Sequence, residues 1–187
     1  MASFYDKAAE YIKKHEGYSD KTYWDVNAYR LGYGSDTITT SKNGAFRKVV
    51  KGDVTNRDMA AIDLARRIKT EFEPRIINKV GAQTYNSLPE NTKIALLSIT
   101  YNYGSLPTNV ANAVKSGDNT KIAQAISANA VHNQGVNAKR RNDEASLVMS
   151  AIQYAKDNPA KTIVALGAIV ALTSIALYLI NFRQKHK

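Results

Sequence analysis

The segment Thr162–Phe182 constrains this chain more than any other feature, because its 21 residues include no charged side chain. A helix rises about 1.5 Å per residue, so this segment would span roughly 31 Å, close to the hydrocarbon thickness of a bilayer. Lys161 precedes the segment and three cations follow it in the tail 183–187, so charge returns at both ends. The sequence predicts a single transmembrane helix over 162–182 that places the protein in a lipid membrane.

The composition of the rest of the chain restricts its partners. A formal net charge of +10 indicates an anionic partner such as nucleic acid, anionic lipid or the acidic polymers of a bacterial wall. Basic and aromatic residues do not interleave and no groove-reading helix is evident, so nucleic acid is not expected. The chain has no cysteine, and its three histidines lack metal-ligand spacing, so we expect no metal and no cofactor.

The N-terminal pattern predicts an amphipathic helix rather than a secretory signal, because it lacks a long apolar run. Ser3 is a plausible cap, Phe4, Ala8 and Ile12 recur at helical spacing, and Gly17 supplies a stop. Glu16 would then lie in the last turn, where the negative end of the helix dipole favours the protonated carboxyl.

The following residues change from strand to helix patterns. Residues 22–50 are rich in Thr, Tyr, Val and Ile and have Asn43-Gly44 as a hairpin signal, so they predict a small antiparallel sheet. Helical patterns follow over 58–72, 91–104, 119–130 and 145–155. The sequence therefore predicts one α+β domain over 1–156, joined by a short linker, 157–161, to the membrane span.

Glu16 and Asp25 are candidates for glycosidic cleavage. That reaction needs one carboxylic acid to protonate the departing oxygen and a second carboxylate to activate water or stabilise the developing positive charge. Spacing alone favours two solvated surface carboxylates, because many basic proteins have a Glu and an Asp nine residues apart. The pattern becomes informative only together with the motifs around it.

Several short motifs resemble the signature of phage-type lysozymes. In that family a Glu-Gly at the end of the first helix precedes a Tyr-x-Asp strand and a Gly-Tyr-Gly turn, and a late segment combines glycine, two arginines and a glutamate. The matching residues here are Glu16, Gly17, Tyr23, Asp25, Gly32, Tyr33 and Gly34, followed by Gly135, Arg140, Arg141 and Glu144. The stretch 97–106 resembles the family's buried helix, and the similarity covers roughly residues 4–150.

The resemblance implies a lysozyme-like, two-lobed α+β fold, in which a small antiparallel sheet lobe and a helical lobe flank a cleft for bacterial peptidoglycan. It implies that Glu16 is the general acid and Asp25 the second carboxylate. Candidate substrate-binding residues are Arg30, Gly32, Tyr33, Gly34, Asp36 and Asn102. For the two glycines, close approach of a saccharide and an ordinary tight turn are compatible explanations. For the late arginines, a structural ion-pair network with the neighbouring acids is favoured.

The sequence departs from the family pattern in the sheet region. Arg30 stands where the family usually has the threonine that helps to hold the attacking water, and the chain from Asp25 to Gly32 is one residue shorter. Arg30 cannot act as a base, but it can orient a carboxylate or bind a substrate oxygen. Asp36 is either an additional cleft group or a turn residue that pairs with a nearby amide.

The expected function is that of a membrane-anchored muramidase of a phage, acting in lysis or as a virion component during entry. Its location would be a virion internal membrane or the host inner membrane. Two alternatives remain open: a lytic transglycosylase that uses Glu16 alone, and a wall-binding virion membrane protein that keeps the fold without turnover.

Overall fold

The computed structural model describes residues 2–42 and 44–157, and the chain divides into two units, residues 1–149 and 150–187. The first unit holds every strand and the site discussed below, and residues 150–157 of the second are helical. Within the described ranges, no helix combines the length and the apolar character needed to cross a bilayer. The predicted span 162–182 lies outside the described residues.

Helix α1, Phe4–Lys13, begins as predicted but ends early. Ser3 Oγ accepts the backbone N–H of Asp6 at 3.2 Å, and the Asp6 carboxylate accepts the N–H of Ser3 at 3.0 Å. The chain then leaves the helix three residues before the predicted end, so Glu16 lies in the α1–β1 loop. The prediction that Glu16 occupies the last helical turn is wrong, and the dipole argument no longer applies to it.

Two small antiparallel sheets follow, where the sequence predicts one. Strands β1, Ser19–Asp25, and β2, Ala28–Gly32, form a hairpin in which Trp24 pairs with Tyr29. Strands β3, Thr37–Ile38, and β4, Arg47–Lys48, form the second pair. The β3–β4 pairing confirms the predicted hairpin across residues 43 and 44.

A nearly continuous helical stretch leads from the sheets into the core. Helix α2, Arg57–Arg67, is capped by Asn56, whose side chain accepts the N–H of Met59 at 2.9 Å. A wide π-turn, Ile68–Phe72, connects it to α3, Glu73–Val80. Pro74 lacks the N–H that an α-helical bond at this point would need, so the turn widens without ending the helix.

Helix α5, Glu90–Tyr103, matches the helical pattern over 91–104 and is the buried helix that the resemblance over 97–106 implies. Residues 94–100 are all buried, and Gly104 ends the helix in a left-handed conformation with φ 75°. The remaining helical elements are α4, Ala82–Ser87, α6, Thr108–Lys115, α7, Asn119–Ala128, the 3₁₀ segment η2, Asn129–Gly135, and α8, Ala138–Asp157. Asp118 caps α7 by accepting the N–H of Thr120 at 2.8 Å.

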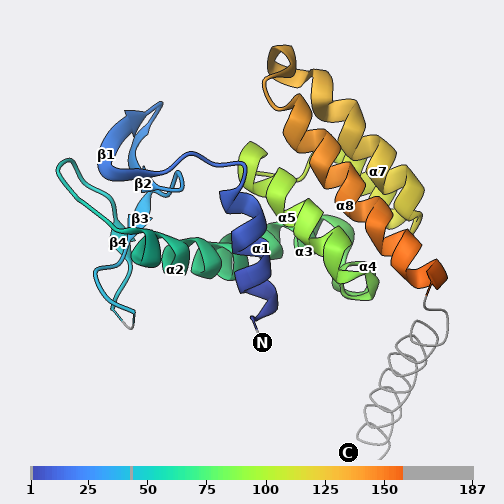
Figure 1. Cartoon of the computed structure of the whole chain (residues 1–187), viewed down its shortest axis with the longest axis horizontal. Helices are drawn as coiled ribbons and strands as arrows, with labels where there is room; N and C mark the ends of the chain where they lie inside the picture. Colours follow the sequence, from blue (N-terminus) through green and yellow to red (C-terminus); the bar gives the residue numbers. More distant parts are fainter. Residues whose placement is uncertain (1, 43, 158–187) are drawn as a thin grey trace, which may run out of the picture. The chain divides into compact units, whose positions relative to one another are not determined.

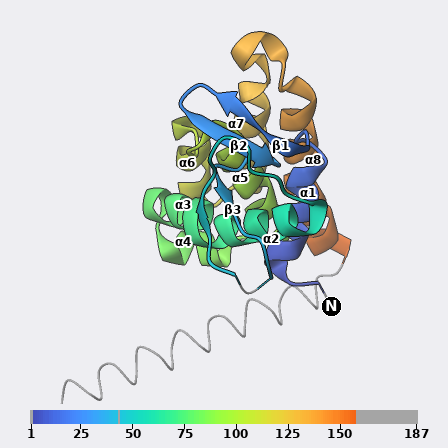
Figure 2. The same cartoon turned by 90° about the vertical axis from the view of Figure 1, so that its left-hand side faces the viewer.

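The first unit has two hydrophobic clusters of unequal size. The larger surrounds α5 and includes apolar residues of α1, α2, α3, α6 and α7. The smaller consists of Leu31, Ile38 and Val49, with Tyr29 packed against it. Figures 1 and 2 show the strands gathered beside α2, with α7 on the other side of α5. The sheet lobe therefore has a modest core of its own and depends on contacts with α2 for its position.

Candidate active site

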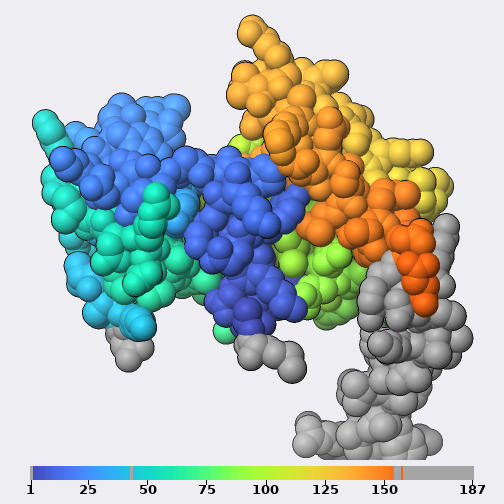
Figure 3. Space-filling view, in the orientation of Figure 1, coloured from blue at the N-terminus to red at the C-terminus, as the bar shows by residue number. Residues whose placement is uncertain are grey.

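A cleft of about 480 Å³ lies between the sheet lobe and the helical lobe. The outline of the molecule dips at this position, between the β1–β2 hairpin and the η2–α8 region (Figure 3). We call this space the cleft, and its lining residues are Glu16, Tyr23, Asp25, Arg30, Gly34, Asp36, Arg67, Phe72, Arg75, Tyr101, Asn102, Tyr103 and Gly104. Three carboxylates and three arginines thus share one concave surface.

Glu16 is held on the helical side of the cleft by an ion pair. Its Oε1 lies 2.5 Å from Nη1 of Arg140, which comes from the first turn of α8. The Glu16 side chain is mostly but not fully buried, and Arg140 is 4 % exposed. The acid is therefore fixed in position and still reaches the cleft surface.

The guanidinium of Arg140 is itself fixed by α5 and α8. Its Nη2 donates to the Ser98 carbonyl at 2.9 Å, and its Nε lies 3.2 Å from Glu144 Oε1. Glu144 also pairs with Arg141 at 2.8 Å and accepts the Ser98 hydroxyl at 2.6 Å. Burial raises the pKa of Glu144, although the charges of Arg141 and Arg140 oppose this shift. This buried cluster holds Nε and Nη2 of Arg140, so that Nη1 points to Glu16.

Asp25 lies on the sheet side, at the end of β1. Arg30 Nε is 2.6 Å from Asp25 Oδ2, an ion pair without hydrogen-bond alignment, and Arg30 Nη1 donates to the Gly34 carbonyl at 3.3 Å. Tyr23 and Arg30 are cross-strand partners, so both side chains lie on the cleft face of the hairpin. Burial raises the pKa of the Tyr23 phenol, and the charge of Asp25 adds to the shift.

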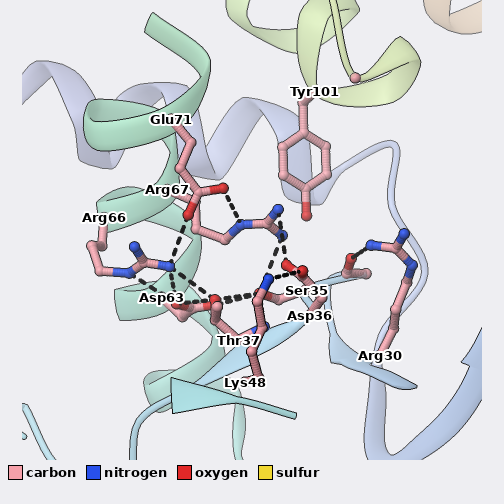
Figure 4. Close-up of polar contacts among 12 residues, drawn as sticks. Arg30, Ser35, Asp36, Thr37, Lys48, Asp63, Arg66, Arg67, Glu71 and Tyr101 are labelled. Carbon is pink, nitrogen blue, oxygen red and sulfur yellow. Dashed lines mark hydrogen bonds and ion pairs between the residues drawn. The ribbon is translucent and has the colours of Figure 1, made fainter. Parts of the chain in front are cut away.

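Asp36 forms the floor of the cleft together with two cations. Lys48 Nζ lies 2.5 Å from one carboxylate oxygen, and Arg67 Nη2 lies 3.2 Å from the other (Figure 4). Burial alone would raise the pKa of Asp36, but the hydrogen bond from Lys48 and the charge of Arg67 lower it overall. The structure therefore places Asp36 at the cleft surface, in an ion-pair network.

A buried polar network beneath Asp36 joins the β2–β3 turn to α2. Asp63 accepts hydrogen bonds from the hydroxyls of Ser35 and Thr37, the latter at 2.9 Å, and pairs with Arg66 at 3.0 Å (Figure 4). Arg67 donates to Ser35 Oγ at 3.2 Å. Because Ser35 and Asp36 are adjacent, this network sets the position of Asp36 relative to the helical lobe.

The back wall of the cleft comes from the end of α5. The Tyr101 hydroxyl donates to the Tyr33 carbonyl at 2.5 Å, and burial raises the pKa of Tyr101. Among the described residues, nothing donates a hydrogen bond to Oδ1 of Asn102, although this oxygen is buried. Asn102 therefore places a buried acceptor, without a donor among those residues, behind the wall of the cleft.

One rim of the cleft is an aromatic ring bordered by cations. Arg67 and Arg75 lie 5.3 and 5.0 Å from the centroid of Phe72, and Arg75 donates to the Gly104 carbonyl at 2.7 Å. The residues that the structure describes contain no group of three His, Asp or Glu side chains arranged to hold a metal ion. The cleft itself is lined by carboxylates, arginines and aromatic rings.

Comparison with known protein families agrees with this geometry. Residues 13–144 match the model of the family described as phage lysozyme. The chain belongs to the phage lysozyme family. Among solved structures, the active form of the P1 phage endolysin Lyz superposes with a TM-score of 0.58 at 19% identity, covering 78% of this chain and 85% of that one. None of the curated proteins compared with the chain matches it.

Most of the residues suggested by the lysozyme motifs do line the cleft. Glu16, Asp25, Arg30, Gly34, Asp36 and Asn102 all lie at its surface. Gly32 and Tyr33 do not. A Cβ on Gly32 would lie 2.8 Å from Cβ of Ala60, so this glycine permits close packing of β2 on α2 rather than approach of a saccharide. The Tyr33 side chain is buried in the larger core.

Several cleft residues could not be assigned from the lysozyme motifs. The ion-pair network expected around Arg140 and Arg141 exists, but it also extends across the fold to Glu16. Arg67, Phe72 and Arg75 were not candidates at all. Their only signal is helical spacing across the π-turn, and that pattern fits packing equally well.

Proposed function

We propose that this phage lysozyme family member is a muramidase that cleaves the glycan strands of bacterial peptidoglycan. The observation that carries the proposal is that Glu16 and Asp25 line one cleft, each held by an arginine. Membership of the family and the fold shared with an endolysin support it. A paired acid and carboxylate across a cleft is the arrangement that glycoside hydrolysis needs.

In the proposed reaction, Glu16 donates its proton to the glycosidic oxygen, and the bond between that oxygen and the anomeric carbon breaks. Asp25 accepts a proton from the water that attacks the anomeric carbon, or stabilises the positive charge that develops there. Arg140 positions Glu16, while Arg30 positions Asp25. Asn102 and Asp36 are proposed to bind the sugar substituents on either side.

One observation favours lytic transglycosylation as a second candidate. Arg30 occupies the place of the family's water-holding threonine and contacts Asp25 directly. In a transglycosylase, Glu16 first protonates the glycosidic oxygen. The resulting carboxylate then accepts the proton of the sugar's own hydroxyl as that oxygen attacks the anomeric carbon. The product is an anhydro-sugar, and no water is consumed.

Digestion of purified peptidoglycan by the full chain in mild detergent tests both candidates, with products identified by mass spectrometry. Hydrolysis yields new reducing ends, and transglycosylation yields anhydro-sugars. Glu16→Gln is expected to lower the rate by about 10²- to 10⁴-fold in either case, since it removes the proton donor. Asp25→Asn is expected to lower it comparably only in the hydrolase.

Matched controls separate catalysis from the loss of a charge. Glu10→Gln removes an exposed carboxylate from α1, and Asp20→Asn removes one from β1. Both are expected to retain the full rate. A wild-type chain that binds peptidoglycan but releases no product of either kind would instead identify a wall-binding protein without turnover.

We also propose that residues 162–182 anchor the protein in a membrane, with a catalytic domain over 1–156, a linker over 157–161 and a basic tail over 183–187. The support is the uncharged 21-residue run and its flanking cations. The full chain is then expected to remain with membranes after alkaline carbonate extraction, and a chain ending at residue 158 to be released. Release of both would reject the anchor. The membrane in question is proposed to be a virion internal membrane or the host inner membrane.

A further inference from the structure

The β1–β2 hairpin carries the chain's sole tryptophan on the face that points away from the cleft. Trp24 is 61% exposed, although it is the largest side chain of the sheet lobe. Its ring meets that of its cross-strand partner Tyr29 edge to face, with centroids 5.1 Å apart. Tyr29 in turn packs on Leu31, Ile38 and Val49. The indole is thus supported from below and open above.

A second concave surface lies beside this ring. This surface, which we call the hairpin hollow, has a volume of about 540 Å³. Its lining residues are Trp24, Asn27, Ala28, Tyr29, Arg30, Asp36, Lys48 and Val49. Arg30 and Asp36 line the cleft as well, so the two spaces meet at these side chains. The hairpin hollow is therefore adjacent to the cleft.

The chemistry of the hairpin hollow suits a saccharide. An exposed indole offers a flat apolar surface to the C–H face of a sugar ring. Asn27 supplies an amide, and Lys48, whose side chain is 76% exposed, supplies an ammonium donor at the edge of the hollow. Asn27, Arg30, Asp36 and Lys48 thus surround an aromatic platform with groups that can hydrogen-bond to sugar hydroxyls and amides.

We propose that the hairpin hollow is a second saccharide-binding site, which holds an N-acetylated amino-sugar of the same glycan strand whose neighbouring units occupy the cleft. This proposal rests on the muramidase function proposed above. The site strengthens the binding of long strands and contacts no reacting atom. It therefore adds affinity for polymer over short fragments.

The sole tryptophan makes the site directly observable. In a full-length Glu16→Gln chain, held in mild detergent, peptide-free glycan strands are expected to shift the tryptophan emission to shorter wavelength and to protect it from iodide quenching. A single disaccharide, which fits within the cleft alone, is expected to change neither signal. Strands that co-sediment with the protein while its emission stays constant would overturn the proposal.

Substitution provides a second test. In the active chain, Trp24→Ala is expected to raise KM for long strands about tenfold with kcat unchanged, and Trp24→Phe to restore most of the loss. Val131→Ala removes a similarly exposed apolar side chain from η2 and is expected to behave as wild type. Thermal unfolding of Trp24→Ala shows whether this variant is folded. If it is unfolded, the emission experiment on the Glu16→Gln chain, which keeps Trp24, tests the second site instead.

The outcomes separate the two proposals. If the wild-type chain cuts peptidoglycan and Trp24→Ala leaves the kinetics unchanged at every strand length, the second site is rejected and the muramidase proposal stands. If the wild-type chain neither binds nor cuts peptidoglycan, both proposals are rejected.

Discussion

On the helical side of the cleft, Glu16 meets Arg140, which is 4% exposed and is also held by Ser98 and Glu144. On the sheet side, Asp25 meets Arg30, which is 26% exposed and has one further long hydrogen bond, to Gly34. Both pairs join a carboxylate to an arginine. The first pair is set by buried contacts between two long helices, whereas the second lies on a two-stranded hairpin. The same type of ion pair therefore occurs in a wall with many buried contacts, which we call the rigid wall, and in a more exposed wall with few contacts.

This difference is useful to an enzyme that cuts a polymer. In the proposed reaction, Glu16 must lie within hydrogen-bonding reach of one oxygen, which favours the rigid wall for this side chain. The opposite wall must admit a strand of varying substituents, which favours a hairpin supported by surface ion pairs.

Removing the buried arginine should damage the fold most. Arg140→Ala leaves Glu144 with one partner fewer in the core and is expected to lower the free energy of unfolding by about 3–5 kcal/mol, measured by urea denaturation. The adjacent Lys139→Ala removes an exposed ion pair with Asp143 and is expected to cost less than about 1 kcal/mol. Equal losses in the two variants would contradict the rigid-wall description.

Gly32 tests how the sheet lobe is attached to α2. Gly32→Ala adds a Cβ 2.8 Å from Ala60 at φ +60°, so we expect a loss of about 2–4 kcal/mol from overpacking and backbone strain together. Gly34→Ala, at φ +85°, would place its Cβ 3.9 Å from the Tyr101 hydroxyl, an ordinary contact, so we expect a loss of about 1–2 kcal/mol from backbone strain alone.

Restoring the space should restore the stability. The double variant Gly32→Ala with Ala60→Gly is expected to be more stable than Gly32→Ala with Ala60 unchanged, because the clash is removed and the strain remains. If the second substitution destabilises further, β2 does not depend on close packing against α2.

The sheet lobe should lose stability in acid. Arg47 binds Asp53 through two contacts of 2.6 and 2.7 Å, and this hydrogen bonding lowers the pKa of Asp53 from 3.8 to about 2. The folded state therefore binds fewer protons than the unfolded state in this range. The contribution of Asp53 is present above about pH 4 and is lost as the pH falls from about 4 to about 2.

Thermal unfolding between pH 2 and 5 measures this contribution. Asp53→Asn and Arg47→Ala are each expected to flatten the acid dependence, because each removes the same pair. Lys51→Ala removes an exposed cation two positions away and is expected to keep the wild-type slope. Wild-type slopes in all three variants would show that the pair does not stabilise the lobe.

The smallest expected effect is a gain. Val26, at the tip of the β1–β2 hairpin, has φ 51° and is 88% exposed, a conformation that a β-branched residue adopts only under strain. Val26→Asn is expected to add about 1 kcal/mol and to raise Tm by about 2–4 °C, since Asn tolerates this region. Val131→Asn, at an exposed valine without positive φ, is expected to leave Tm unchanged.

Local features of the fold could be predicted from the sequence because they depend on local physics. The caps at Ser3 and Asp118, the left-handed end of α5 at Gly104 and the β3–β4 hairpin all follow from nearby residues. The early end of α1 could not be predicted, because its cause is tertiary: Glu16 turns toward Arg140, which comes from the other end of the first unit.

The same distinction applies to the site. Glu16, Asp25, Arg30 and Asp36 lie close together in the sequence, and short motifs indicated that they share a cleft. The burial of Tyr33 and the packing of Gly32 depend on α2 and α5, which no local pattern describes. Arg67 ends α2 and Arg75 lies in α3, on the two sides of the π-turn, and a pattern of 3.6 residues per turn does not anticipate the wider turn between them.

The pair between Glu16 and Arg140 joins positions 124 residues apart. During synthesis, both carboxylates and both hairpins leave the ribosome long before α8 does, so a nascent chain carries the acid without the group that orients it. Contacts so distant along the chain are also among the slower ones to form. If the proposed mechanism holds, the order of translation delays activity until nearly all of the first unit has been made.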